Sequence, residues 1–171
     1  MPALLKNIRR RVMNLTLLFV LSPFVVGAAN AQTRTPADAV DDFHAALRSK
    51  NTAAALSLLD RGLVVFEFGA IDPTAEAYAF AHLPSDIDVA AVTQWKLETR
   101  RVGGEGNERW VLSSYHVTGA QSDGTPIDQT LLETVIVRRS GDRFRIVHLH
   151  WSTNDLAYQA AAQRKSQKTP P

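Results

Sequence analysis

Two histidines near the end of the chain have the spacing that a β-strand needs to present both on one face. His148 and His150 alternate within an apolar segment, and alternate side chains of a strand point to the same side of a sheet. Phe144 and Ile146 have the same phase, so we expect the histidines beyond apolar residues, at the mouth or floor of a pocket. Such an H-x-H pair supplies two metal ligands where further donors converge on it.

Three other residues are candidates to complete a site around this pair. His82 ends a predicted helix, Glu67 ends a short apolar strand, and Glu133 lies on a neighbouring long strand. With one carboxylate, His82, His148 and His150 would suit a divalent metal such as zinc or copper. Two alternatives are polar pocket residues that bind an organic ligand or move a proton, and histidines in a structural role. His82 is also suited to capping a helix end, where the helix dipole favours a cation.

Glu67 is an acid inside an apolar strand, flanked on both sides by phenylalanine. Burial would raise its pKa and make it a general acid or base near neutral pH. On an edge strand the same side chain would instead reach water. We therefore take Glu67, His82, His148 and His150 as the candidate catalytic residues.

The candidate ligand-binding residues lie on the predicted long strands: His116, Glu133 and Trp151. His116 is expected either as a pocket wall or as an exposed residue, and a tryptophan such as Trp151 is more often a core or interface anchor. His44 is expected at the surface or against the rim of the sheet. The sequence has no Gly-rich phosphate loop, G-x-S-x-G elbow or H-E-x-x-H helix, which argues against nucleotide hydrolysis and zincin-type proteolysis.

The first 31 residues contain the three parts of a secretory signal peptide in the required order. Four basic residues come first, the apolar run 12–26 follows, and Ala29-Asn30-Ala31 forms an A-x-A cleavage pattern. We expect cleavage after Ala31, a short linker over 32–35, and a protein that is periplasmic or secreted. An uncleaved anchor is disfavoured, because a span needs roughly 20 apolar residues.

The charge of the chain depends on this signal peptide. Removing its four basic residues leaves 15 Lys and Arg against 17 Asp and Glu, a formal charge of −2 in place of +2. The basic character of the whole chain therefore gives no reason to expect nucleic acid or a membrane as a partner of the mature protein. The sequence has no cysteine, so the core must hold by packing alone.

Helix signals fill the first half of the mature chain. Thr35 caps a helix that starts at Pro36, and Asp38 completes the capping box. Asn51 caps a second helix over 52–59, and a third helix over 74–83 is expected to stop at Pro84. A short strand over 63–68 lies between the second and third helices, and the segment 85–91 is ambiguous.

Strand signals fill the second half. Four long segments alternate with a period of two and are separated by glycine-containing turns, over 95–102, 109–119, 127–138 and 143–152. Strands joined by such turns are antiparallel neighbours. The pattern predicts an α+β domain in which N-terminal helices pack on a curved antiparallel sheet. The polar, proline-terminated tail over 155–171 is expected to be partly disordered.

Five short motifs, in this order, resemble the NTF2-like superfamily, in particular its SnoaL-like or DUF4440 branch. They are Asp41–Leu47 in the first helix, Val64–Glu67 in the short strand, His82–Asp86, Glu133-Thr134, and Arg145–Ser152 at the end. The resemblance covers 36–154 and implies a cone-shaped half-barrel that forms homodimers with the sheets back to back.

The same resemblance leaves the activity open, because this fold serves many functions. We expect the cone to bind a small organic ligand, with acid/base chemistry of the isomerase, dehydratase or lyase type that needs no redox cofactor. The alternatives are a noncatalytic binding or homo-oligomeric assembly module, and a divalent-metal protein that uses the H-x-H pair.

Overall fold

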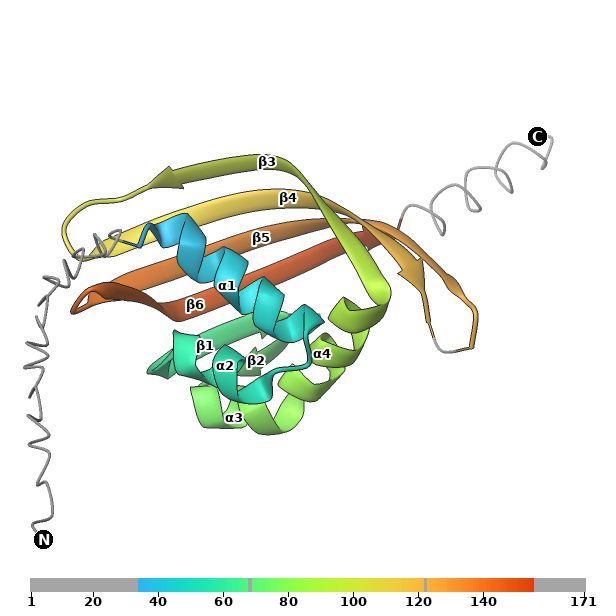
Figure 1. Ribbon diagram of the computed structural model, residues 1–171, viewed down its shortest axis with the longest axis horizontal. Coiled ribbons are helices and arrows are strands. Elements are labelled where there is room, and N and C mark those ends of the chain that lie inside the picture. The colour runs from blue at the N-terminus through green and yellow to red at the C-terminus, as the bar shows by residue number, and fades with distance from the viewer. Residues whose placement is uncertain (1–33, 68, 122, 156–171) are drawn as a thin grey trace, which may run out of the picture. The chain divides into compact units, whose positions relative to one another are not determined.

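The computed structural model describes residues 34–67, 69–121 and 123–155. The predicted signal peptide over 1–31, and the tail beyond residue 155, lie outside these residues. The described domain has four helices and six strands, in the order α1, α2, β1, β2, α3, α4, β3, β4, β5, β6 (Figure 1). Within the described ranges, the helices are too short or too polar to cross a membrane.

The first two helices form as the sequence predicts. In α1 (Pro36–Arg48), the Thr35 hydroxyl accepts from the Asp38 amide and the Asp38 carboxylate accepts from the Thr35 amide. In α2 (Thr52–Leu58), the Asn51 side chain accepts from the Ala54 amide. These caps satisfy amide groups that the first helical turn leaves unpaired.

The third predicted helix forms, but it ends before His82, and a fourth helix that was not predicted begins directly after it. Thr74 caps α3 (Ala75–Ala81), and α4 (Leu83–Val92) follows directly and includes the ambiguous segment. Pro84 therefore starts a helix and does not stop one, because the first turn needs no amide donor from proline. The break places His82 at a corner between two helix axes, where its side chain is free to leave both helices.

One curved sheet forms the other layer, with strand order β2-β1-β6-β5-β4-β3. The strands are β1 (Leu59–Glu67), β2 (Ala70–Asp72), β3 (Thr93–Gly103), β4 (Glu108–Ala120), β5 (Pro126–Ser140) and β6 (Arg143–Asp155). All neighbours are antiparallel except β1 and β6, which are parallel. The α+β cone, with helices packed on a curved sheet, is confirmed.

The concave face of the sheet, which we call the inner face, carries the core. Figure 1 shows α1 lying across this face, with α3 and α4 below it. Fully buried side chains from both layers meet there, among them Val40, Phe43 and Leu47 of α1 and Val135 and Leu149 of the sheet. Burial of such side chains stabilises the domain by about 1.5–3 kcal/mol each.

A β-bulge in β6 changes which side chains face the core. Val137 pairs with Ile146 and Ile136 with His148, so Val147 is an extra residue on β6. An extra residue reverses the alternation of the side chains that follow it. Ile146 before the bulge and Leu149 after it are both buried on the inner face.

Candidate functional site

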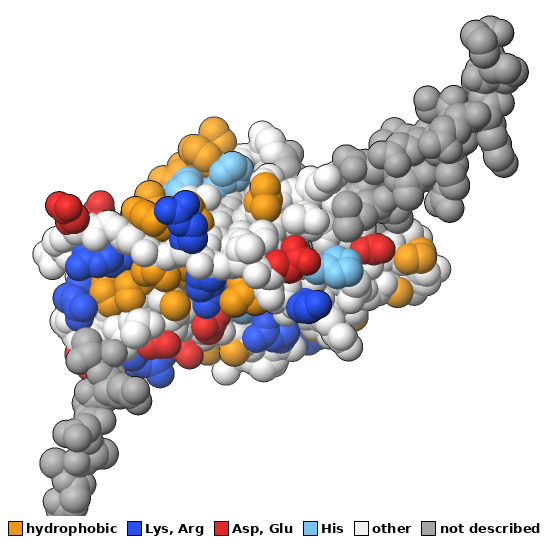
Figure 2. Space-filling model, turned by 90° about the horizontal axis from the view of Figure 1, so that it is seen from above, with side chains coloured by type: hydrophobic (Ala, Val, Ile, Leu, Met, Phe, Trp, Pro, Cys, Tyr) orange, Lys and Arg blue, Asp and Glu red, His pale blue; other side chains and the backbone are white. Residues whose placement is uncertain are grey.

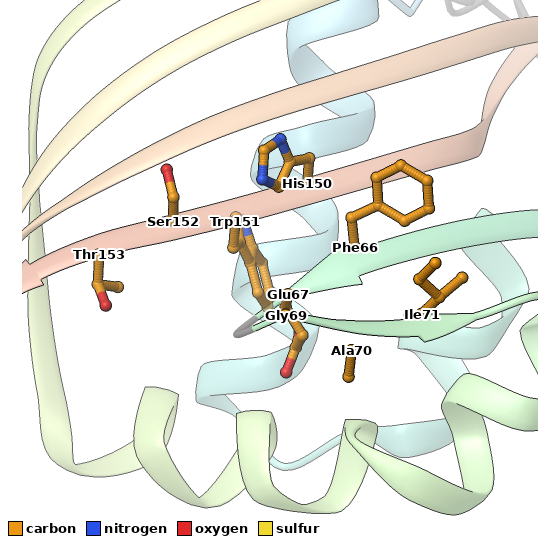
Figure 3. A pocket seen from close by; sticks show the side chains of 9 residues that line it. All are labelled: Phe66, Glu67, Gly69, Ala70, Ile71, His150, Trp151, Ser152 and Thr153. Carbon is orange, nitrogen blue, oxygen red and sulfur yellow. The ribbon is translucent and has the colours of Figure 1, made fainter.

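The bulge places the H-x-H pair on the convex face of the sheet, which we call the outer face. Figure 3 shows His150 and Trp151 on opposite sides of β6, with Trp151 directed toward the helices. His148 donates from Nδ1 to the Val64 carbonyl at 2.9 Å, and its ring stands edge-on to the exposed ring of Phe66, 5.1 Å away. The expectation that both histidines share a face with Ile146 is wrong, since that alternation ignores Val147.

His82 is the histidine that turns toward the helical layer. Its Nδ1 lies 2.6 Å from Oδ2 of Asp72, the last residue of β2, whose side chain is only 6% exposed. The hydrogen bond to the Asp72 carboxylate raises the pKa of His82. Because a carboxylate can only accept, it fixes Nδ1 as the donor and leaves Nε2 as the nitrogen that exchanges protons.

Glu67 ends β1 with its side chain on the inner face, where the residue is 3% exposed. Its Oε2 has no hydrogen-bond partner among the described residues. Burial, and then the charge of Asp86, raise the pKa of Glu67 to about 7. The prediction of a buried acid in this strand agrees with the structure, which excludes the alternative of an edge-strand acid in water.

Asp86, on α4, is a second acid with a raised pKa. It accepts a hydrogen bond of 2.5 Å from the hydroxyl of Tyr78, which is fully buried on α3. Burial raises the pKa of Asp86 to about 6, although the Tyr78 hydrogen bond opposes this effect. Glu67, Asp72 and Asp86 therefore form an acidic cluster, with His82 beside it.

Two cavities adjoin this cluster. The first, which we call the cone cavity, has a volume of about 140 Å³ and lies between α4 and strands β3 to β6. Its lining residues are Ser85, Asp86, Val89, Trp95, Val117, Gln129, Leu131, Trp151 and Thr153. The second, the edge cavity, has a volume of about 400 Å³ and includes Glu67 (Figure 3). Trp151 and Thr153 line both cavities, so the two are neighbours.

Glu133 lies on the inner face in the same row as Glu67 and Trp151, but it is already paired. His44 Nε2 lies 2.7 Å from Oε2 of Glu133, both side chains are buried, and the Trp151 indole donates to the same oxygen at 2.9 Å. Burial alone would raise the pKa of Glu133, but His44 and these hydrogen bonds hold it below its ordinary value. Of the two expected places for His44, the surface is wrong: the residue is buried and its side chain lies against the sheet.

The pair of His44 and Glu133 belongs to a larger polar network. Tyr115 contacts Glu133 at 3.4 Å and accepts a 2.6 Å hydrogen bond from Arg100. Arg100 also binds both oxygens of Asp41 on α1. These contacts connect α1 to three strands, so we assign Glu133 to holding the helix on the sheet and orienting Trp151.

The remaining candidates divide between the two faces. His116 lies on the outer face and pairs with Asp128 at 2.7 Å, so it does not form a wall of the cone cavity. Trp151 lines both cavities, and its role in ligand binding stays a prediction. Of the four candidate catalytic residues, Glu67 and His82 come together, whereas His148 and His150 do not join them.

The residues expected to bind a metal are divided in the same way. His82 faces the acidic cluster and the H-x-H pair faces outward, so the three histidines do not converge. No group of three or more metal-ligating side chains with suitable geometry occurs among the described residues. The donor set proposed from the sequence therefore does not fit a zinc or copper ion.

Three residues of the site were not among the candidates: Asp72, Tyr78 and Asp86. The sequence held one signal for them. Tyr78, His82 and Asp86 recur every four residues, the interval that places side chains on one side of a helix. Asp72 had no such signal, because its role depends on the pairing of β2 with β1.

Comparison with known proteins agrees with this fold. The profile of the SnoaL-like domain family matches residues 37–159. A candidate ketosteroid isomerase from Shewanella frigidimarina is 27% identical with a TM-score of 0.64, and the match covers 67% of this chain and 92% of that one. A search among curated proteins returned no match.

Two further solved structures have the same fold at lower identity. A candidate dehydratase of the NTF2-like family from Streptomyces avermitilis is 18% identical with a TM-score of 0.57, covering 69% of this chain and 92% of that one. The CaMKII hub of S. rosetta is 21% identical with a TM-score of 0.59, covering 71% and 98%. The profile match over more than half of the chain settles the family, while the DUF4440 assignment stays a prediction. The chain belongs to the SnoaL-like domain family of the NTF2-like superfamily.

Proposed function

We propose that the domain binds a small organic ligand where the cone cavity meets the edge cavity, and transfers protons to and from it through Glu67, which lines the edge cavity. The observation that carries this proposal is the carboxyl of Glu67, which is buried, has an unpartnered oxygen within the described structure, and has a pKa of about 7. An acid with a pKa near the working pH is half ionised and can both accept and return a proton.

His82 is the proposed partner of Glu67. Asp72 holds its Nδ1, which leaves Nε2 for exchange, and the charge of His82 acts on Glu67. Two acid/base groups at one site allow one to remove a proton while the other donates one. The corresponding reactions are isomerisation, dehydration or elimination. The relatives described as a candidate ketosteroid isomerase and a candidate dehydratase support this class of chemistry.

The cone cavity limits the size of the ligand. Its volume of about 140 Å³ is below the roughly 300–1,000 Å³ of pockets that enclose drug-sized molecules. A ligand that reaches the Glu67 carboxyl must also enter the edge cavity, and one of steroid size would fill much of both. We expect compounds with one ring, or a short chain, to fit without a change in the protein.

The test is hydrogen exchange at carbon. Small cyclic ketones and unsaturated ketones are incubated with the protein in D2O, and deuterium incorporation next to the carbonyl is followed by NMR. We expect Glu67→Gln to slow the enzyme-dependent exchange at least 100-fold, the low end of the range for a general base. The exposed residue Glu98 supplies the control Glu98→Gln, which should be unaffected. Equal exchange in wild type and Glu67→Gln would contradict the proposal.

A second proposed role is assembly of a homodimer through the outer face. Leu112, Thr134, His150 and Phe66 are consecutive partners across four strands and make one row on this face. Leu112 and Phe66 are 38% and 41% exposed, and Leu132 beside them is 54% exposed. Figure 2, which views the molecule of Figure 1 from above, shows hydrophobic and histidine side chains next to one another at the surface. The hub structure supports an assembly function for this fold, either beside ligand binding or in place of it.

Export to the periplasm or beyond is proposed from the N-terminal sequence alone. The basic, apolar and A-x-A segments within 1–31 support it. Expression of the full chain followed by cell fractionation and N-terminal sequencing tests it. We expect a product outside the cytoplasm that begins at Gln32, and a cytoplasmic protein that begins at Met1 would contradict the proposal.

A further inference from the structure

The groups around the cone carry negative charge and have few positive partners. Glu67 and Asp86 both have raised pKa values, and burial is the largest cause for each. No Lys or Arg lines either cavity in the described part of the chain. His82 is the cation that acts on both acids, and its Nδ1 is committed to Asp72. A ligand with a carboxylate or phosphate would meet like charges here.

The unpartnered oxygen of Glu67 identifies what is missing from this arrangement. A buried carboxylate oxygen without a donor is costly, because it has lost its water without gaining a hydrogen bond. Asp86 lines the cone cavity and has one oxygen bound by Tyr78, so its other oxygen is available to a donor. A group that donates several hydrogen bonds and carries a positive charge would satisfy both acids at once.

The remaining walls of the cone cavity are suited to the rest of such a ligand. Trp95 and Trp151 meet edge to face, with ring centres 5.9 Å apart. Both indole N–H groups are used elsewhere, that of Trp95 by the Thr93 hydroxyl at 2.8 Å and that of Trp151 by Glu133 at 2.9 Å. The two tryptophans therefore present aromatic carbon, and no free N–H group, to the cavity. Tryptophan is the aromatic side chain that attracts cations best, and it also packs on apolar groups.

We propose that the ligand is a small organic ammonium ion bound where the two cavities meet, with its charge between Asp86 of the cone cavity and Glu67 of the edge cavity and its apolar body against the two tryptophans. This inference rests on the proposed function, since it names the class of ligand that the same cavity takes. It assigns Asp86, Trp95 and Trp151 to ligand recognition and leaves proton transfer with Glu67 and His82.

The test compares three compounds that share one ring and differ in charge: benzylammonium, benzyl alcohol and benzoate. Isothermal titration calorimetry at pH 8 measures their affinities. We expect benzylammonium to bind at least tenfold more tightly than benzyl alcohol, and benzoate to bind more weakly than both. Asp86→Asn should weaken benzylammonium at least fivefold and leave benzyl alcohol unchanged. Glu98→Gln, which removes an exposed carboxylate outside both cavities, is the matched control.

A pH series on the wild-type protein provides a second measurement that needs no variant. Benzylammonium stays charged from pH 6 to pH 8, whereas Glu67, with a pKa of about 7, changes from mostly neutral to mostly ionised. Because only the ionised fraction binds the cation well, the titration of Glu67 alone should lower the affinity about tenfold from pH 8 to pH 6. Asp86, with a pKa of about 6, loses charge over the same range and His82 gains it, so both changes add to the fall. Benzyl alcohol should show no such change.

The outcomes separate this inference from the proposed function. The inference that the ligand is an ammonium ion is refuted if benzyl alcohol or benzoate binds more tightly than benzylammonium, or if the affinity for benzylammonium does not depend on pH. The proposal that the domain binds a small ligand would still stand. If none of the three compounds binds, the inference of an ammonium ligand is refuted as well. The deuterium-exchange assay then decides separately whether Glu67 transfers protons.

Discussion

Replacing Glu67 by glutamine removes a carboxyl group that is buried next to Asp86 and close to Asp72. The folded pKa of about 7 is above the ordinary value of 4.5, so folding disfavours the ionised form. Below about pH 4.5 the group is neutral in both states and has no effect on stability. From about pH 4.5 to pH 7 the unfolded chain ionises first, so the native state loses stability, and above pH 7 the loss is constant.

The size of this loss follows from the two pKa values. The rise from 4.5 to about 7 corresponds to roughly 3 kcal/mol, at 1.36 kcal/mol for each pKa unit. Water that reaches the carboxyl through the edge cavity reduces this to about 2 kcal/mol. Glutamine has nearly the same shape and stays neutral at every pH. We therefore expect the free energy of unfolding of Glu67→Gln, relative to that of wild type, to be about 2 kcal/mol greater at pH 8 than at pH 5.

Urea denaturation of wild type, Glu67→Gln and Glu98→Gln at pH 5 and pH 8 measures this gain. The difference between Glu67→Gln and wild type isolates Glu67, because other titrating groups contribute to both proteins. In a thermal melt at pH 8 the gain corresponds to roughly 6 °C. If the difference is the same at pH 5 and pH 8, Glu67 does not have a raised pKa and the reasoning is refuted. Glu98→Gln should show no change with pH relative to wild type.

Three further predictions concern the rest of the domain. His44→Ala leaves the buried carboxyl of Glu133 without its hydrogen-bond partner, so urea denaturation should show a loss of about 3 kcal/mol, and adding Glu133→Gln should restore part of it; an unchanged stability would mean that the pair is not formed. Gly119→Ala should cost about 2 kcal/mol, because a Cβ there would lie 2.5 Å from the Val92 carbonyl, whereas Gly62→Ala, which meets only a side chain at 3.5 Å, serves as its control. Leu132→Asp should convert the proposed homodimer into a monomer by size-exclusion chromatography with light scattering, and a mass unaffected by this change would place any interface elsewhere.

Local signals predicted most of the fold. The capping box of Thr35 and Asp38 marked the start of α1, and the turns between the long strands marked the three hairpins that β3, β4, β5 and β6 form. These features depend on residues a few positions apart, so the sequence displays them directly. The parallel pairing of β1 with β6 was not predicted, because it joins the two ends of the domain and leaves no local pattern.

The site was predicted only in part, for two physical reasons. Val147 looks like any other strand residue, so nothing in the sequence marks it as the extra residue that turns His148 and His150 outward. Asp72 and Asp86 acquire their roles from tertiary contacts with His82 and Tyr78. Glu67 was found because an acid within an apolar run is itself the anomaly. A residue whose chemistry contrasts with that of its sequence neighbours can be identified from the sequence. A residue whose role comes from contacts with residues far along the chain cannot.

The place of β6 in the sheet has a consequence for when the domain can fold. β6 is the last strand along the chain, yet it lies between β1 and β5 and is the strand that joins the β2-β1 hairpin to the β5-β4-β3 meander. Its contact with β1 links His148 to Val64, 84 residues earlier. Contacts at such separations form slowly. A chain that is still emerging from the ribosome therefore cannot complete the sheet until β6 is available. The link between the first and last strands of the domain is thus the last part of the sheet that can form.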